Sequence, residues 1–203
     1  MSERDEDREH LFTQVREAVR GGCEDEDSIL EGLEARVEMM LEDSDEALVE
    51  ELAEYARRLF REQREREAAW SEPSLNDAID SAFAELDAKG IVTLQGAGYT
   101  MSDGWYDVNE LASRRSPQPR GAVFYHGQDL ERGVRGEGLM LAFGAYEDDD
   151  AKHVAASLAI AREVCETLAR HGVRTEWNGD VDQRIQIPPF VWRKRRYTRL
   201  ARA

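Results

Sequence analysis

Apolar side chains recur at helical spacing through the first 90 residues, and this pattern predicts four helices. The apolar positions fall three or four residues apart in residues 10–19, 28–40, 46–69 and 74–89. Residues typical of helix ends separate these segments: Gly22 follows the first, Ser28 and Glu31 have capping-box spacing, and Ser74 and Gly90 flank the last. The first 90 residues are therefore predicted to be helical throughout.

The pattern becomes alternating after Gly90. Residues 91–94 alternate as in a strand, residues 96–98 contain two glycines, and residues 99–101 can return as a second strand, which predicts a small winged-helix-like hairpin. A short helix is expected over residues 103–115. The segment RRSPQPR, residues 114–120, holds two of the five prolines and predicts a linker between two domains, residues 1–115 and residues 121–203.

The C-terminal part alternates between strand-like and helical segments. Strands are predicted at residues 122–126, 139–146, 173–177 and 184–187, and helices at residues 129–134 and 152–171. Such alternation is typical of a sheet with a long helix packed on one face. The predicted fold class is α+β: an all-helical N-terminal part, followed by an α/β sandwich-type domain with a ferredoxin-like or split βαβ sheet.

Charge is distributed unevenly along the chain. The net charge is −16; residues 1–90 hold 28 acidic and 11 basic side chains, whereas residues 91–203 hold 15 and 16. A strongly acidic surface repels nucleic acid and anionic lipid and attracts basic partners. An alternative interpretation is that these acidic residues only keep a helical bundle soluble.

Neither a membrane span nor a signal peptide is predicted. No apolar run approaches the roughly 20 residues that a membrane-spanning helix needs, and the first ten residues are acidic and polar. The two cysteines, Cys23 and Cys165, allow at most one disulfide bond. A reducing cytoplasm is therefore the expected location.

A few polar and aromatic residues stand where strand-like runs end, and they are the candidate binding residues: Tyr125, His126, Gln128, Asp129, Glu176 and Trp177. Binding clefts of α/β proteins lie at such strand ends, and a histidine beside a carboxylate can act as a general base. Under the alternative interpretation, Gln128 or Asp129 caps the following helix, His126 bonds to loop backbone, and Trp177 is a partly buried sheet aromatic.

Motifs of common cofactor and nucleophile sites are missing from the sequence. It contains no GxGxxG, GxxxxGK[ST] or GxSxG segment, and His126, Asp129 and Glu176 lack the spacing of metal ligands. No cofactor and no metal site are predicted, and the protein is expected to be non-enzymatic. The alternative is a small-molecule enzyme or sensor that uses a cleft formed by His126, Asp129 and Glu176.

The C-terminal tail is basic and carries Arg193, Lys194, Arg195, Arg196, Arg199 and Arg202. It can contact RNA or dock on the acidic helices of its own chain, and the opposite charges favour docking. The predicted function is a binding or regulatory protein, inhibitor- or immunity-like, whose acidic helical surface engages a basic protein. Nucleic-acid binding through the hairpin and the tail is a further alternative, although duplex DNA is disfavoured because the acidic excess of residues 1–90 repels phosphate and the helix over residues 74–89 has one lysine and no arginine.

Four stretches resemble a family of uncharacterised bacterial proteins: FYHGQDLERGV, GLMLAFGAY, VRTEWNGDVDQRIQI and WRKRR. The resemblance covers residues 74–196 and implies a shared fold unit, with no activity attached to it. Members of the family often have Cys-rich turns where this chain has residues 95–99, which contain no cysteine, so the resemblance implies no metal there. In its acidity and its order of strands and helices, the chain is also similar to the acidic protein regulators of ribonuclease E.

Overall fold

The computed structural model describes residues 3–41, 43 and 45–197. The chain divides into two compact units, one of residues 1–72 with residues 194–203 and the other of residues 73–193. We call them the helical unit and the sheet unit. An all-helical N-terminal part followed by a part with a mixed sheet confirms the α+β class.

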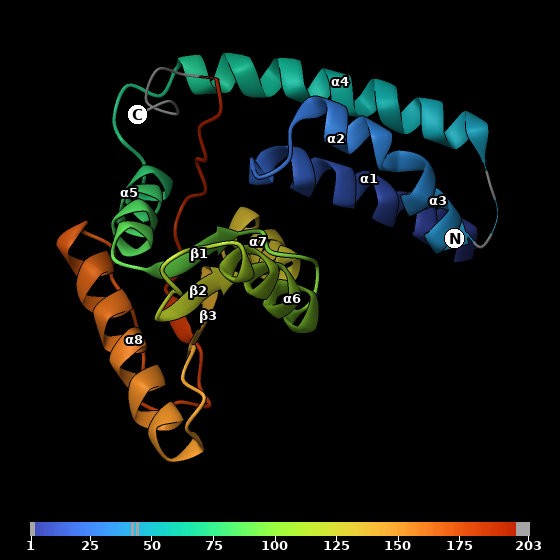
Figure 1. The fold of residues 1–203 in the computed structure, drawn as a ribbon. Coiled ribbons are helices and arrows are strands. Elements are labelled where there is room, and N and C mark those ends of the chain that lie inside the picture. The colour runs from blue at the N-terminus through green and yellow to red at the C-terminus, as the bar shows by residue number, and fades with distance from the viewer. Residues whose placement is uncertain (1–2, 42, 44, 198–203) are drawn as a thin grey trace. The chain divides into compact units, whose positions relative to one another are not determined.

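The helical unit contains α1 (Glu3–Gly21), α2 (Glu26–Glu31), α3 (Leu33–Leu41) and α4 (Glu46–Ala68) (Figure 1). Apolar side chains of all four helices form one core, which includes Val15, Ile29, Val37 and Phe60. The helix predicted over residues 28–40 is two helices, and the first begins behind Asp25, whose carboxylate accepts the backbone N–H of Ser28. Asp25 therefore caps this helix, three residues before the predicted start.

The sheet unit contains α5 (Leu75–Ala88), β1 (Ile91–Gln95), α6 (Met101–Ser113), β2 (Gly121–Tyr125), α7 (Gly127–Val134), β3 (Leu139–Ala145), α8 (Asp150–Arg170) and β4 (Ile185–Ile187). The strands lie in chain order, with β1 parallel to β2 and the other two pairs antiparallel. The parallel strands are direct neighbours, from Ile91 opposite Gly121 to Gln95 opposite Tyr125. The finer expectation of a ferredoxin-like or split βαβ sheet is therefore wrong, because no strand separates the parallel pair.

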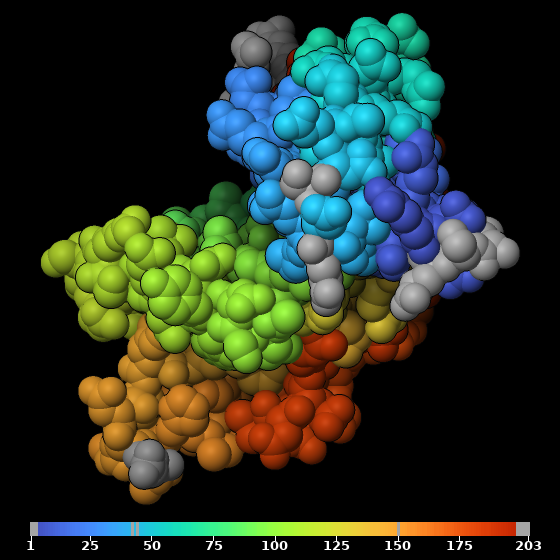
Figure 2. Space-filling model, turned by 90° about the vertical axis from the view of Figure 1, so that its right-hand side faces the viewer, coloured from blue at the N-terminus to red at the C-terminus, as the bar shows by residue number. Residues whose placement is uncertain are grey.

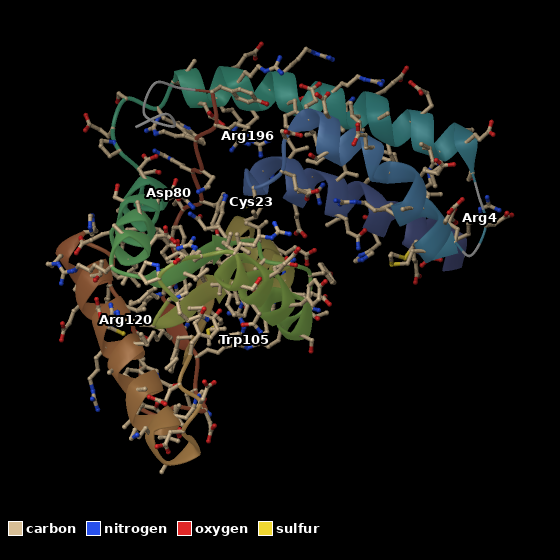
Figure 3. The ribbon with its side chains drawn as sticks, viewed as in Figure 1. Arg4, Cys23, Asp80, Trp105, Arg120 and Arg196 are labelled. Carbon is tan, nitrogen blue, oxygen red and sulfur yellow. The ribbon has the colours of Figure 1, made fainter. Side chains whose placement is uncertain are left out.

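Helices cover both faces of this sheet. Alternate strand residues, including Val123 and Leu141, pack with α5 and α8 on one face, while Phe124 and its neighbours pack with α6 on the other (Figures 1 and 3). A Cβ atom on Gly104 of α6 would lie 2.4 Å from the Phe124 ring, so the glycine permits the close approach of helix and sheet. Every residue of β2 is consequently buried, which explains its continuous apolar run.

The predicted hairpin at residues 91–101 is wrong. β1 pairs in parallel with β2, and Thr100 instead caps α6, because its hydroxyl accepts the backbone N–H of Asp103 while the Asp103 carboxylate accepts the backbone N–H of Thr100. The domain boundary expected between residues 115 and 121 also differs from the observed division. Residues 114–120 connect α6 to β2 inside the sheet unit, where Arg115 pairs with Asp87 and Arg120 pairs with Glu163.

Candidate functional site

Four of the six candidate residues lie where β2 ends and α7 begins. Tyr125 is the last strand residue, His126 is the N-cap of α7, and Gln128 and Asp129 lie in the first turn of that helix. Residues three apart on a helix lie on the same face, so His126 and Asp129 are brought together. The side chain of His126 forms no capping hydrogen bond.

His126, Asp129 and Arg184 form one contact group, which we call the His126 cluster. His126 Nε2 lies 3.1 Å from Asp129 Oδ2, and Arg184 Nη1 donates to both Asp129 oxygens at 3.0 and 2.9 Å. The same Arg184 nitrogen is 3.3 Å from His126 Nε2. The side chains of His126 and Asp129 are only 6% and 3% exposed, whereas that of Arg184 is 33% exposed.

Burial favours the uncharged form of His126. It lowers the pKa of His126, and the Arg184 cation lowers it further, against the opposing effect of Asp129. The neutral form of the imidazole is therefore favoured, and Arg184 forms an ion pair with the Asp129 carboxylate. Nδ1 of His126 is buried and has no hydrogen-bond partner among the described residues.

The chain's own backbone fills the strand-end position where a cleft was expected. Gly127 N–H donates to Gly98 O at 2.9 Å, Gln128 N–H donates to Tyr99 O at 3.2 Å, and Ala97 N–H donates to Tyr125 O at 3.0 Å. The donors at the start of α7 are thus bonded to the loop after β1. A ligand that needed these donors would have to displace that loop.

Tyr125 and Gln128 have different environments from the His126 cluster. The Tyr125 ring is buried against Phe83 and Trp192, and its hydroxyl donates to Gln95 Oε1 at 2.8 Å. Tyr125 therefore contributes to the core, while the side chain of Gln128 is exposed.

Glu176 and Trp177 belong to a separate part of the sheet unit. Glu176 forms an isolated bridge with Gln186, and its half-exposed carboxylate pairs with Arg174 at 2.7 Å. The Trp177 indole donates to the carbonyls of Asp180 and Gln183, both at 3.0 Å, and its ring packs edge-on against Phe143. Among the described residues, their hydrogen bonds and ion pairs go to other partners, and none goes to His126 or Asp129.

Arg184 is the cluster residue that sequence reasoning missed. It lies 55 positions from Asp129, so no local spacing connects the two. One signal was present, because Arg184 is the only basic residue among residues 175–192. A lone cation next to an apolar strand requires a counter-charge when the strand is buried.

A second candidate site lies on the helical unit between α3 and α4. A pocket of about 190 Å³ is lined by Glu34, Val37, Glu38, Asp45, Glu46, Val49 and Glu50, and we call it the acidic pocket. Figure 2 shows α3 and the start of α4 beside each other on this face (blue to cyan). Within the described chain, Glu34, Glu38 and Glu46 have no cation at ion-pair distance, whereas Asp45 pairs with Arg4 and Glu50 pairs with Arg57.

The carboxylates of the acidic pocket lie over an apolar base. Val37 is fully buried and Val49 is partly buried. The pKa of Asp45 is lowered because its carboxylate accepts the backbone N–H of Leu48, so it stays ionised. Pockets for small molecules are usually about 300–1,000 Å³, so the volume here suits a single side chain.

No group of three His, Cys, Asp or Glu side chains among residues 3–41, 43 and 45–197 is arranged to hold a metal ion. In the same part of the chain, no helix combines the length and apolarity needed to cross a membrane.

The chain belongs to the family defined by a domain of unknown function, DUF6891, which matches residues 4–196. The match includes the helical unit as well as the sheet unit, so it extends beyond the resemblance over residues 74–196. No curated protein matches the chain. No solved structure matches it either.

Proposed function

We propose that the protein is a non-enzymatic binding or regulatory protein whose helical unit engages a basic protein partner. The acidic pocket is the observation that carries this proposal. Five carboxylates surround two valines there, and none of the described residues that line the pocket is basic. A lysine or arginine of a partner fits this chemistry, because its alkyl stem packs on apolar surface while its charged end meets carboxylates.

The surrounding surface has the same sign of charge. Residues 24–50 hold twelve acidic side chains and one basic side chain, Arg36. Clustered charge of one sign raises the association rate of an oppositely charged partner. This layout suits an inhibitor- or immunity-like protein that covers a basic surface of its target.

We also propose a cytoplasmic location. Cys23 and Cys165 form no disulfide bond, which fits a reducing compartment. Burial raises the pKa of the Cys165 thiol, so it is not a reactive thiolate.

The proposal is tested with an octa-arginine peptide as the basic probe. We expect Glu34→Gln/Glu38→Gln/Glu46→Gln to weaken peptide binding about tenfold at about 0.15 M salt, where surface charges interact only over about 8 Å. The glutamines keep the shape of the pocket and remove three of its five negative charges. Binding is measured by fluorescence anisotropy over a range of salt concentrations.

The matched control removes three carboxylates elsewhere on the same unit: Glu54→Gln/Glu62→Gln/Glu65→Gln on the arginine-rich part of α4. Both variants lose the same formal charge. If they weaken binding equally, net charge alone explains the attraction and the acidic pocket is not the docking site.

A further inference from the structure

Within the helical unit, residues 194–197 pack against the helices, and each of these four residues contacts them. Lys194 and Arg195 are 9% and 4% exposed, and Figure 3 shows Arg196 between α4 and the end of α1. These contacts agree with the expectation that the tail docks on its own helices; Arg199 and Arg202 lie outside the described residues. We call the contacted residues the tail-binding surface: Val19, Gly22, Phe60, Glu67 and Trp70.

Glu67 binds the backbone of this segment. Glu67 is fully buried, with 0% of its surface exposed. One of its carboxylate oxygens accepts the backbone N–H groups of Arg196 and Tyr197, both at 2.9 Å. Gln63 donates to the other oxygen at 3.1 Å. A buried carboxylate is costly without donors, so the surface requires an extended segment that presents two N–H groups.

The two arginines bond to backbone carbonyls near helix ends. Arg196 donates to Val19 O at 2.6 Å and to Glu24 O at 3.0 Å, and its guanidinium lies 5.0 Å from the Phe60 ring centre. Arg195 donates to Trp70 O at 3.0 Å and lies 5.5 Å from the Trp70 ring centre. Planar guanidinium groups suit both contacts, since they donate several hydrogen bonds and stack on aromatic faces.

Shape adds to this selection. Gly22 has a φ of +77°, and a Cβ atom there would lie 2.6 Å from Lys194 Cγ, so the glycine leaves room for the bound segment. The aromatic ring of Tyr197 lies 4.9 Å from the Arg64 guanidinium carbon. The surface thus holds two arginines followed by an aromatic residue.

We propose that the tail-binding surface recognises an extended Arg-Arg-aromatic segment of a partner protein, and that residues 194–197 compete with it. The inference rests on the proposed function, a basic partner for the helical unit, and names a second determinant on that partner. The chain's own segment shows the ligand chemistry. Because the segment is tethered, it competes at a high effective concentration and weakens binding of any free segment.

The test uses the peptide Trp-Arg-Lys-Arg-Arg-Tyr, which repeats residues 192–197, and the full-length chain. In Arg195→Ala/Arg196→Ala the tethered competitor loses its anchors, so the peptide is expected to bind about tenfold more tightly than to the unmodified chain. The charge-matched control Arg174→Ala/Arg193→Ala should leave the affinity unchanged. A Trp-Lys-Lys-Lys-Lys-Tyr peptide of equal charge should bind about tenfold more weakly than the arginine peptide.

Glu67→Gln, added to the double variant, should reduce peptide binding about tenfold, whereas Glu65→Gln should not. Equal affinity for the unmodified chain and the double variant overturns the inference. Loss of binding in both glutamine variants also overturns it. So does a dimer in sedimentation, if the dimer forms by exchange of the tail between two copies of the chain.

A second measurement needs no substitution. In the unmodified chain, excess arginine peptide should speed hydrogen exchange at the amides of Arg196 and Tyr197 by displacing them from Glu67. Unchanged exchange at saturating peptide overturns the inference even if the double variant fails to fold. The acidic-pocket variants are tested separately with octa-arginine, so the proposed function can fail or stand independently.

Discussion

Asp129 is a buried carboxylate that depends on one cation. It is 2% exposed, and Arg184 donates to both of its oxygens. Removing the cation leaves a buried charge with His126 as its remaining partner. We predict that Arg184→Gln lowers the free energy of unfolding by about 2–3 kcal/mol, somewhat less than for a fully buried pair because Arg184 is one-third exposed.

The control for this prediction is Arg174→Gln, which breaks the exposed pair with Glu176. Its expected cost is about 0.5 kcal/mol or less. Urea unfolding of the two variants measures the difference. Equal and small losses of unfolding free energy in the two variants would mean that hydration by water, and not Arg184, stabilises the Asp129 carboxylate.

His126 makes stability depend on pH. Its pKa is lowered in the folded chain by burial and by Arg184, against Asp129 and Asp103. Below the unfolded value of about 6.5, the unfolded chain therefore binds a proton that the folded chain does not, and stability falls as the pH decreases. We predict that the unfolding free energy of His126→Gln, measured by urea unfolding, decreases less between pH 7.5 and 5 than that of the unmodified chain. The same pH dependence in both proteins would contradict this prediction.

The sequence predicted the His126–Asp129 pair but not Arg184, because the separation along the chain differs: three positions for the pair and 55 between Asp129 and Arg184. His126 and Asp129 are three residues apart, so helix geometry alone places them together. Arg184 reaches them through the fold. Glu176 shares with them only its position at the end of a strand-like run. The roles of these residues stay predictions until a ligand is tested.

Local signals predicted both ends of α5 correctly, but they did not predict how β1 pairs. Ser74 caps α5 in a capping box with Asp77, and Gly90, with a φ of +81°, follows that helix. β1 has the same alternating pattern whether it pairs with residues 99–101 or with residues 121–125. Only the burial of both sheet faces distinguishes these pairings, and one strand's sequence does not reveal that.

The ends of α5 and α8 are joined by an ion cluster around Glu85. Hydrogen bonds from Lys89 at 2.7 Å, His171 at 2.8 Å and Arg170 at 2.5 Å lower the pKa of Glu85 to about 2. A lowered carboxylate pKa contributes stability above the unfolded value of about 4.3, and this contribution is lost as the pH falls toward 2.

We therefore predict that Glu85→Gln destabilises the chain at pH 6 and has a clearly smaller effect near pH 2.5, where much of the contribution is lost. Exposed Glu166 of the same helix pair provides the control, because Glu166→Gln removes an equal charge outside the cluster. Urea midpoints at the two pH values give the comparison. A Glu85→Gln effect independent of pH would show that the ion cluster does not respond to protonation of Glu85.

The net charge of the chain argues against nucleic-acid binding. The chain carries −16, and nucleic-acid affinity depends largely on cations that neutralise phosphates. Arg195 and Arg196, the cations best suited to phosphate, donate instead to backbone carbonyls of the helical unit. The hairpin that suggested a winged-helix domain is replaced by a strand of the mixed sheet.

We predict no measurable binding of duplex DNA or single-stranded RNA at about 0.15 M salt, where the Debye length is about 8 Å. Fluorescence anisotropy with labelled oligonucleotides makes the measurement, and Arg195→Ala/Arg196→Ala should change nothing. Removal of residues 192–203 provides the decisive comparison. If the full chain binds RNA tightly and this removal abolishes the binding, the tail must leave the helices and bind phosphates. A nucleic-acid partner would then replace the basic protein partner proposed above.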